Sequence, residues 1–402
     1  MRASQVLQKC LCRSLEPMHK ARSRVLLRSV EALLAGRRLT LMDIARAWPG
    51  AERVRAPLKA FDRLLSNPHL RQERELIYGD MARWLLRSER PVIVIDWSDL
   101  KADKAWCLLR AAVPVGGRTL PVLDMVFPGQ QQGTPKAEKL FLEHLRTLIP
   151  SSTRPILVTD AGFGRPWFQA VSAMGWNWVG RLRHRTLVKP VKVSDERDQW
   201  VPCRALYALA RSTPRDMGLM DTVRNAPWVC RVVIHRKPPR GRKRRNHFGH
   251  IARSKVSLQC AAREREPWLI VASPALADLS ARQLIVLYGR RMQIESSFRD
   301  LKSHRYGQGF EDSLTRSGKR IEILLLVNAL AAFASWLAGL ACEAVGIAHW
   351  LSPRRSVRRL YSVLRLGREA LVRSWPTEHL LRWIDRLRSL PSTTLTHMQV
   401  PA

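Results

Sequence analysis

The sequence has little that would cross-link or export the chain. Its seven cysteines are odd in number and scattered, and no two of them form a C-x-x-C pair. This pattern excludes a disulfide framework and does not indicate a zinc ribbon. The first residues, MRASQVLQKCLCRSLEP, have no apolar core and so do not resemble a signal peptide. We therefore expect a protein of the reducing cytoplasm.

Acidic residues are also scarce. The 402 residues include 33 Asp and Glu against 69 Lys and Arg, which gives a formal net charge of +36. This excess is too large for solubility alone and predicts a polyanionic partner, either nucleic acid or an anionic membrane surface. The basic residues are spread along the whole chain, so we expect a long path of phosphate contacts and salt-dependent binding. The hydrophobic content of 46% predicts a folded, multidomain protein.

One apolar run is long enough to cross a membrane. The stretch IEILLLVNALAAFASWLAGLAC covers residues 321–342, which satisfies the length of a bilayer span. It contains Glu322 and Asn328, however, and is rich in alanine. In so basic a chain we interpret it as a buried core helix, and we expect no membrane partner.

The first 75 residues read as short helices. Thr40 is placed to cap a helix over TLMDIARAW, with Asp43 three residues further on. A Pro49-Gly50 turn follows, and Pro57 can open the next helix. Short helices around such a turn, with basic outward faces, resemble a helix-turn-helix DNA-binding unit. The alternative is a plain helical bundle with a solvated basic face.

The pattern then changes to strands and helices in alternation. RPVIVIDWSD (90–99) predicts a buried strand that ends on Asp96, and RPILVTDAGFG (154–164) predicts another that ends on Asp160. Two strands joined at Gly116-Gly117 lie between them, with a helix near 135–149. These elements predict a mixed α/β sheet. Residues 186–270 are different, because polar and basic loops surround a strand at 228–236, and we interpret them as an insertion.

A third carboxylate lies in YGRRMQIESSFRDLK, residues 288–302. We expect one helix from Ser280 to Lys302, with a capping box at its start. At 3.6 residues per turn, four polar residues share a stripe at the edge of the buried face, where a cleft would lie. They are Tyr288, Arg291, Glu295 and Lys302. Three others on this helix are expected to face solvent: Gln293, Ser296 and Asp300.

Three carboxylates on rigid elements can hold two magnesium ions for phosphoryl transfer on DNA. Asp96, Asp160 and Glu295 offer such a set, with Mn²⁺ as a substitute ion. Arg291 can grip a phosphate with two parallel hydrogen bonds, and Lys302 can supply a point charge. A strand-terminal aspartate is often only a turn former, and Asp99 is a rival to Asp96 within the same motif.

The spacing of Tyr288, Arg291, Glu295 and Lys302 fits the signature Y-(2)-R-(3)-E-(6)-K without a gap. In this respect the chain resembles bacterial insertion-sequence DDE transposases of the IS-four group, and is closest to the Tn-ten transposase. VIDWSD and VTDAGF look like that group's first and second aspartate motifs. The resemblance covers nearly the whole chain.

The resemblance implies cut-and-paste transposition through nicking, hairpin formation, hairpin resolution and strand transfer in a paired-end homodimer. It makes Asp96, Asp160 and Glu295 the metal ligands, and places Tyr288, Arg291 and Lys302 on the transposon-end backbone. Trp268 occupies a place like that of a tryptophan on which relatives stack a flipped base. Two alternatives remain open: another RNase H-like nuclease, and a decayed transposase that acts as a non-catalytic repressor.

The same resemblance implies an RNase H-like core with a β-rich insertion and helical ends. The expected parts are a helical DNA-binding domain (1–75), the first part of the core (76–185), the insertion (186–271), the second part of the core (272–345) and a helical C-terminal region (346–402). In the last part, residues 352–375 predict a basic amphipathic helix that would bind DNA or a second protomer.

Overall fold

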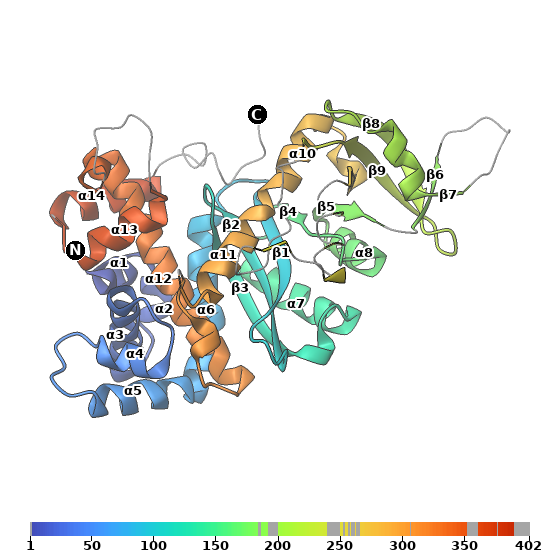
Figure 1. Cartoon of the computed structure of the whole chain (residues 1–402). Coiled ribbons are helices and arrows are strands. Elements are labelled where there is room, and N and C mark those ends of the chain that lie inside the picture. The colour runs from blue at the N-terminus through green and yellow to red at the C-terminus, as the bar shows by residue number, and fades with distance from the viewer. Residues whose placement is uncertain are drawn as a thin grey trace. The chain divides into compact units, whose positions relative to one another are not determined.

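The computed structural model describes residues 2–183, 186–191, 200–238, 250–251, isolated positions from 254 to 262, 266–305, 307–351, 361–375 and 377–389. The fold is mixed α/β, as the sequence predicts (Figure 1). The chain divides into two compact units. Residues 1–155 and 292–399 form the first, and residues 156–291 form the second.

The first unit begins with helices, as predicted. Thr40 caps α4, because its hydroxyl oxygen accepts a hydrogen bond of 3.1 Å from the backbone N–H of Asp43. The helix after the Pro49-Gly50 turn starts at Arg55, two residues before Pro57. The helices are α1 (Ala3–Cys10), α2 (Cys12–Leu15), α3 (Lys20–Gly36), α4 (Leu41–Arg46), α5 (Arg55–Leu65) and α6 (Pro68–Leu85).

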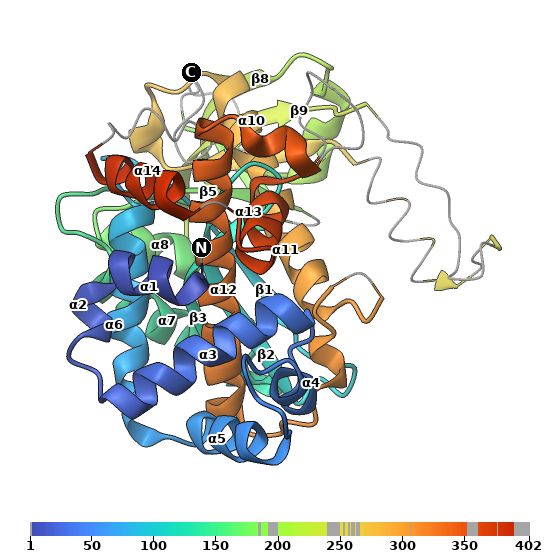
Figure 2. The same ribbon diagram turned by 90° about the vertical axis from the view of Figure 1, so that its left-hand side faces the viewer.

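Helix α12 (Gly318–Ala344) is the central helix of the first unit. It is long and apolar enough to cross a membrane, but 89% of its most apolar window is buried inside the protein. It packs against α1, α3, α5 and α6 on the N-terminal side and against α13 (Val363–Val372) and α14 (Thr377–Ser389) from the end of the chain (Figure 2). Because its neighbours cover it on all sides, it is uniformly apolar rather than amphipathic, and the prediction of a core helix is confirmed.

Two glycines allow α12 and α13 to approach closely. A Cβ added at Gly339 would strike the backbone carbonyl of Val363, and one added at Gly367 would strike that of Ser335. The helical part of the predicted segment 352–375 that the structure describes is α13, and residues 352–360 lie outside the described residues. The C-terminal helices are therefore part of the core around α12.

Three antiparallel strands complete the core of the first unit. They are β1 (Val92–Asp99), β2 (Trp106–Pro114) and β3 (Thr119–Pro128), in the order β3-β2-β1. The turn between β2 and β3 has Gly116 at φ 78° and Gly117 at φ 100°, a backbone conformation that favours glycine. The prediction that the first strand ends on Asp96 is wrong. Pairing with β2 continues to Asp99, because polar side chains on a strand do not interrupt its backbone hydrogen bonds.

The remaining helices of the first unit flank these strands. Helix α7 (Pro135–Leu148) packs on β3 and α6, close to the predicted range of 135–149. Helix α11 (Met292–Lys302) packs on β1, β2 and β3 through its buried residues Ile294, Phe298 and Leu301. Short 3-10 turns lie at Gly129–Gln131 (η1), Phe310–Asp312 (η4) and Ile347–Leu351 (η5).

The second unit holds a mixed sheet in the order β4-β5-β10-β9-β8-β6-β7, in which β4 and β5 are parallel and the other neighbours antiparallel. The predicted insertion contributes β6, β7 and β8 beside the expected strand β9. Helix α8 packs on β5, and α10 packs on β5, β9 and β10. The bounds are β4 (Ile156–Val158), α8 (Arg165–Ala173), β5 (Asn177–Leu182), β6 (Leu187–Pro190), β7 (Val201–Pro202), η2 (Cys203–Leu209), β8 (Arg215–Thr222), β9 (Trp228–His235), β10 (Trp268–Ala272), η3 (Pro274–Leu276) and α10 (Ala281–Arg290).

The prediction of one helix from Ser280 to Lys302 is wrong. The capping box at Ser280 and Gln283 forms as expected. Helix α10 nevertheless ends at Arg290, and the N–H of Arg291 donates to the carbonyl of Tyr288 at 3.1 Å, a bond three residues back that tightens the turn. Gly289 weakens the helix just before this point. Tyr288 and Arg291 therefore belong to the second unit, and Glu295 and Lys302 to the first.

Candidate active site

Asp96 and Glu295 line one cavity of the first unit. The cavity has a volume of about 430 Å³ and is lined by residues of β1, α11 and the segment after α11. Lys302 also lines it, so the structure brings together two of the three predicted carboxylates and one of the predicted phosphate-binding residues. The other lining residues are Trp97, Ser98, Phe298, Arg299, Ser303 and Glu311.

Strand β1 fixes the position of Asp96. The four residues before it, Val92–Ile95, are fully buried, and Asp96 itself is half-buried opposite Arg110 of β2. The next residue, Trp97, packs its ring edge-on against Phe127 with 5.4 Å between the ring centroids. A buried strand paired with β2 gives the Asp96 carboxylate a fixed backbone at the edge of a cavity.

Helix α11 fixes the position of Glu295. Its apolar side is anchored in the core, and the ring of Phe298 lies 5.4 Å below the guanidinium of Arg110. Residues four and seven positions after Glu295 return to the same side of a helix, which places Arg299 and Lys302 beside it. The side of α11 that faces the cavity thus carries one carboxylate and two cations.

Lys302 is tied to the strand that carries Asp96. Its Nζ donates to the hydroxyl oxygen of Ser98 and to the backbone carbonyl of Asp99, at 3.1 Å each. Asp99 itself does not line the cavity. Its Oδ1 is buried without a hydrogen-bond partner, and its Oδ2 lies 3.6 Å from Lys104 Nζ. Of the two rival aspartates, Asp96 is the one that faces the cavity.

Glu311 is a third carboxylate of this cavity, and we did not single it out from the sequence. It lies in η4, directly after Gly309 at φ 60° and the buried Phe310. The only sequence signal was the acidic pair Glu311-Asp312 just after the strongly basic helix end. Nothing in the sequence around Glu311 distinguishes it from an ordinary exposed carboxylate, so its position in this cavity follows only from the structure.

Asp160 lies in the second unit. It follows β4 by two residues, and its Oδ1 accepts a hydrogen bond of 2.8 Å from the backbone N–H of Gly162. Within the described part of the chain, no group of three or more His, Cys, Asp or Glu side chains is arranged to hold a metal ion. The donor chemistry at the cavity still fits magnesium, because Asp96 and Glu295 offer the hard carboxylate oxygens that this ion prefers.

The other predicted DNA-contacting residues form an aromatic and cationic cluster in the second unit. Tyr288 is buried and meets the ring of Trp268 edge-on, with 5.0 Å between the ring centroids. The guanidinium of Arg291 lies 5.9 Å from the Tyr288 ring, and Lys237 Nζ lies 4.8 Å from the Trp268 ring. Burial and the neighbouring Lys237 lower the pKa of His235, which also contacts Trp268.

The side of α11 that the sequence predicts to face solvent also contacts other parts of the first unit. Gln293 accepts a hydrogen bond of 2.9 Å from the backbone N–H of Gly117, and Asp300 forms an ion pair with Arg118. The prediction that Gln293, Ser296 and Asp300 face solvent holds for Asp300, whose side chain is 52% exposed, whereas Gln293 and Ser296 are half-buried; the β2-β3 turn contacts Gln293 and Asp300. This contact holds α11 at its second face.

Residues 87–333 match the family described as Transposase DDE domain. This span is more than half of the chain, so the protein belongs to this family and is a transposase of the DDE class. All seven residues predicted for the site fall inside the matched span. No curated protein matches the chain.

Proposed function

We propose that this protein is a bacterial insertion-sequence transposase of the IS-four group, related to the Tn-ten transposase, that moves its element by cut and paste. The observation that carries the proposal is the cavity at which Asp96 and Glu295 meet beside Lys302, inside the transposase domain. The core would be RNase H-like. The reaction would nick a transposon end, form and resolve a hairpin on that end, and join it to target DNA.

Asp96, Asp160 and Glu295 are proposed to hold two Mg²⁺ ions, or Mn²⁺ in their place. When bound, the ions would stabilise the anionic transition state of phosphoryl transfer. Lys302 and Arg299 lie beside Glu295 and would offset repulsion between the carboxylates and an incoming phosphate. Asp96 lies on a strand that its buried neighbours hold in place.

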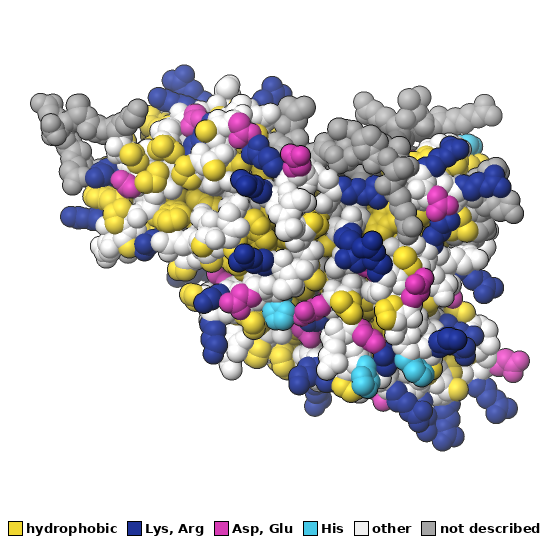
Figure 3. Space-filling model, turned by 180° about the vertical axis from the view of Figure 1, so that it is seen from behind, with side chains coloured by type: hydrophobic (Ala, Val, Ile, Leu, Met, Phe, Trp, Pro, Cys, Tyr) yellow, Lys and Arg dark blue, Asp and Glu magenta, His cyan; other side chains and the backbone are white. Residues whose placement is uncertain are grey.

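The partner is proposed to be double-stranded DNA, comprising the terminal inverted repeats of the element and the target. Lys and Arg side chains are spread over the face shown in Figure 3, which supports binding along an extended DNA path. Tyr288 and Arg291 would contact the transposon-end backbone, and Trp268 would stack on a base. The active form would be a homodimer acting at the nucleoid in the cytoplasm, with residues 1–75 binding DNA.

The test is a cleavage assay on labelled duplexes that contain the inverted repeats flanking the gene, with Mg²⁺. We expect the wild type to yield nicked and hairpin products, and Glu295→Gln to bind the same DNA but yield none. Glu143→Gln is the matched control, because Glu143 is an exposed carboxylate on α7 of the same unit. A chelator should stop cleavage by the wild type.

Each other outcome identifies a rival. Specific binding without cleavage by the wild type would indicate a repressor derived from a transposase. Nicking without any hairpin or strand-transfer product would indicate a nuclease. Equal cleavage by wild type and Glu295→Gln would show that Glu295 is not a metal ligand.

A further inference from the structure

A second cavity lies in the first unit, on the other face of α11. It has a volume of about 260 Å³. Helix α11 lines it with Ser297, Asp300 and Leu301, and at 100° per residue these lie opposite the side that carries Glu295 and Lys302. One helix therefore separates this cavity from the candidate active site.

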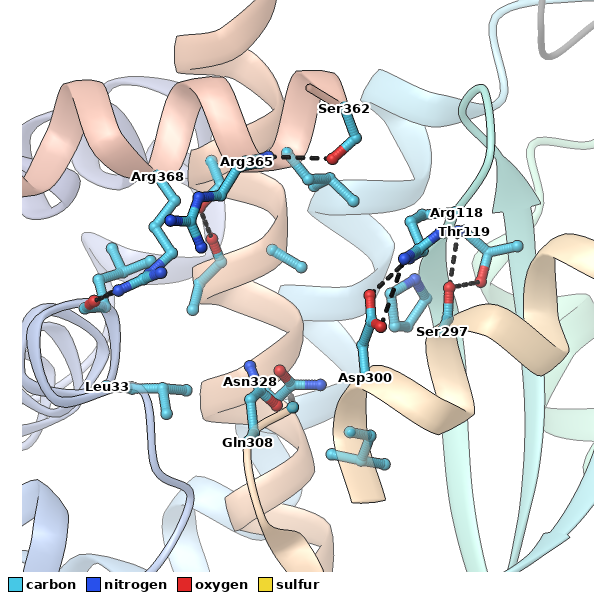
Figure 4. A pocket seen from close by; sticks show the side chains of 18 of the residues that line it. Leu33, Arg118, Thr119, Ser297, Asp300, Gln308, Asn328, Ser362, Arg365 and Arg368 are labelled. Carbon is cyan, nitrogen blue, oxygen red and sulfur yellow. Dashed lines mark hydrogen bonds and ion pairs between the residues drawn. The ribbon is translucent and has the colours of Figure 1, made fainter. Parts of the chain in front are cut away.

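Positive charge is concentrated on one wall of this cavity (Figure 4). Arg37, Arg365 and Arg368 line it, and together with Arg373 they lie 3.1–3.9 Å from the buried carboxylate of Glu369. Arg373 does not line the cavity, so the three arginines of this wall share one carboxylate, which leaves two positive charges without an anionic partner in this set. The cavity is thus short of negative charge.

The other two arginines of the cavity are already neutralised. Arg110 makes two hydrogen bonds of 2.7 Å with Asp124, and Arg118 is paired with Asp300. Their charges are balanced one to one. The shortage of negative charge is therefore confined to the wall formed by α3 and α13.

The start of α13 adds to the excess of positive charge on this wall. Ser362 caps this helix, with its hydroxyl oxygen accepting from the backbone N–H of Arg365 at 3.2 Å. Arg365 is thus in the first helical turn, where the helix dipole favours anions and disfavours cations. Burial, and then the charge of Arg37, lower the pKa of Arg368 to about 10. Arg365 lies at the positive end of a helix dipole, and Arg368 lies near another positive charge. A bound anion would offset both unfavourable interactions.

Two amide side chains in the cavity have hydrogen-bonding groups to spare. Asn328 of α12 is 7% exposed and lines the cavity, and no side-chain hydrogen bond from it is found among the described residues. The Oε1 atom of Gln308 is buried without a hydrogen-bond partner. Buried polar atoms are normally paired, so Gln308 Oε1 indicates that a further hydrogen-bond donor belongs in this cavity.

We propose that this cavity is a binding site for a phosphate group, held by Arg365 and by the amide of Asn328. Arg368 contributes its charge, since its Nε and Nη2 already donate to the backbone carbonyl of Leu34 at 3.0 and 2.9 Å. Guanidinium groups bind phosphate oxygens through paired hydrogen bonds, and the small volume suits a single phosphate-bearing group. The phosphate would come either from the DNA backbone or from a free phosphate compound. Because α11 forms one wall, occupancy would also support the helix that carries Glu295.

The first experiment is calorimetric titration of the full chain with inorganic phosphate at constant ionic strength. We expect Arg365→Gln to weaken binding about tenfold or more, since it removes a charged hydrogen-bond donor. Arg146→Gln is the control, because Arg146 is an exposed arginine of α7 outside the cavity, and it should leave the affinity unchanged.

Asn328→Leu gives a second test with two readouts. It should weaken phosphate binding severalfold, because a donor to the ligand is lost, and should not lower the midpoint of thermal unfolding in phosphate-free buffer, since it places an apolar side chain on an apolar helix. A residue with a purely structural role would not produce this combination. If Asn328→Leu fails to fold, Arg365→Gln still decides the question, because its side chain is 43% exposed.

The site is overturned if the wild type shows no saturable binding, or if Arg365→Gln and Asn328→Leu bind phosphate as the wild type does. A short duplex of random sequence then separates the two sources. If saturating duplex displaces phosphate, and Arg365→Gln lowers the salt slope of DNA binding by about one, the occupant is a DNA phosphate. If phosphate binds equally well with duplex present, the occupant is a free phosphate compound. Neither result depends on DNA cleavage, so this proposal and the proposed function can fail separately.

Discussion

The ammonium group of Lys302 donates to the backbone carbonyl of Asp99 across 3.1 Å, and so joins the end of α11 to the end of β1. These are the two elements that carry Glu295 and Asp96. A second bond of the same length, to Ser98 Oγ, strengthens the join. Lys302 therefore has a positioning role in addition to the phosphate contact that we propose for it.

Replacing Lys302 by Met should affect both stability and cleavage. We expect the loss of two hydrogen bonds from a charged donor to lower the unfolding midpoint by a few degrees, and cleavage to fall more than tenfold. Thermal unfolding and the transposon-end assay measure the two effects. Lys319→Met, at an exposed lysine of α12, is the control. Lost cleavage with an unchanged midpoint would argue against the positioning role.

Asp96 and Asp99 should respond differently to the same change. Asp96→Asn removes a carboxylate from the cavity and is expected to abolish cleavage. Asp99→Asn changes a group outside the cavity and should retain at least a tenth of wild-type activity. The measurement is the initial rate of nicking at saturating DNA. The reverse ranking would make Asp99 the ligand.

The ion pair between Arg110 and Asp124 is buried, with exposed fractions of 2% and 0%. Removing one partner leaves a buried charge alone, so Arg110→Met should cost about 3–5 kcal/mol of unfolding free energy. The double change Arg110→Met with Asp124→Leu should cost less than the single one, because no lone charge remains. Urea unfolding of both variants tests this, and a double variant less stable than Arg110→Met would contradict it.

The close packing of α12 and α13 depends on two glycines. Gly339→Ala and Gly367→Ala would each push a methyl group into the backbone of the other helix, and each should cost about 1–3 kcal/mol or more. Gly289→Ala is the matched control, because it lies in helix α10 with open space around the added carbon and should gain about 0.5–1 kcal/mol. Denaturant midpoints of the three variants give the comparison.

Cysteine labelling tests the burial of the core. Burial and the nearby Asp99 raise the pKa of Cys107 to about 11, and burial raises the pKa of Cys230 to about 12. The thiolate is the reactive form, so both should stay protonated and react slowly with iodoacetamide at pH 8, and faster only as pH approaches these values. Of the six cysteines that the structure describes, Cys12 is half-buried and the others are buried, so Cys12 should react first among them. Mass spectrometry of the native protein would refute this if Cys107 were labelled as fast as Cys12.

Several features could be predicted from the sequence because their causes are local. Thr40 caps α4 through a hydrogen bond to a residue three positions away, and the Gly116-Gly117 turn needs a backbone conformation that glycine supplies. The apolar run at 321–342 has no polar face, which fits a helix surrounded by other apolar elements, and 89% of its most apolar window is buried inside the protein. Family membership also followed from short motifs, in which a few residues at fixed spacing carry the resemblance.

Tertiary structure decided the rest. Asp96 lies inside β1 rather than at its end because β2 continues to pair with it, and Glu311 joins the cavity from a separate turn. The arginines around Glu369 come from residues as far apart as Arg37 and Arg373. Local periodicity and capping are set by neighbouring residues, whereas which charges meet across a cavity depends on how distant helices and strands pack against one another.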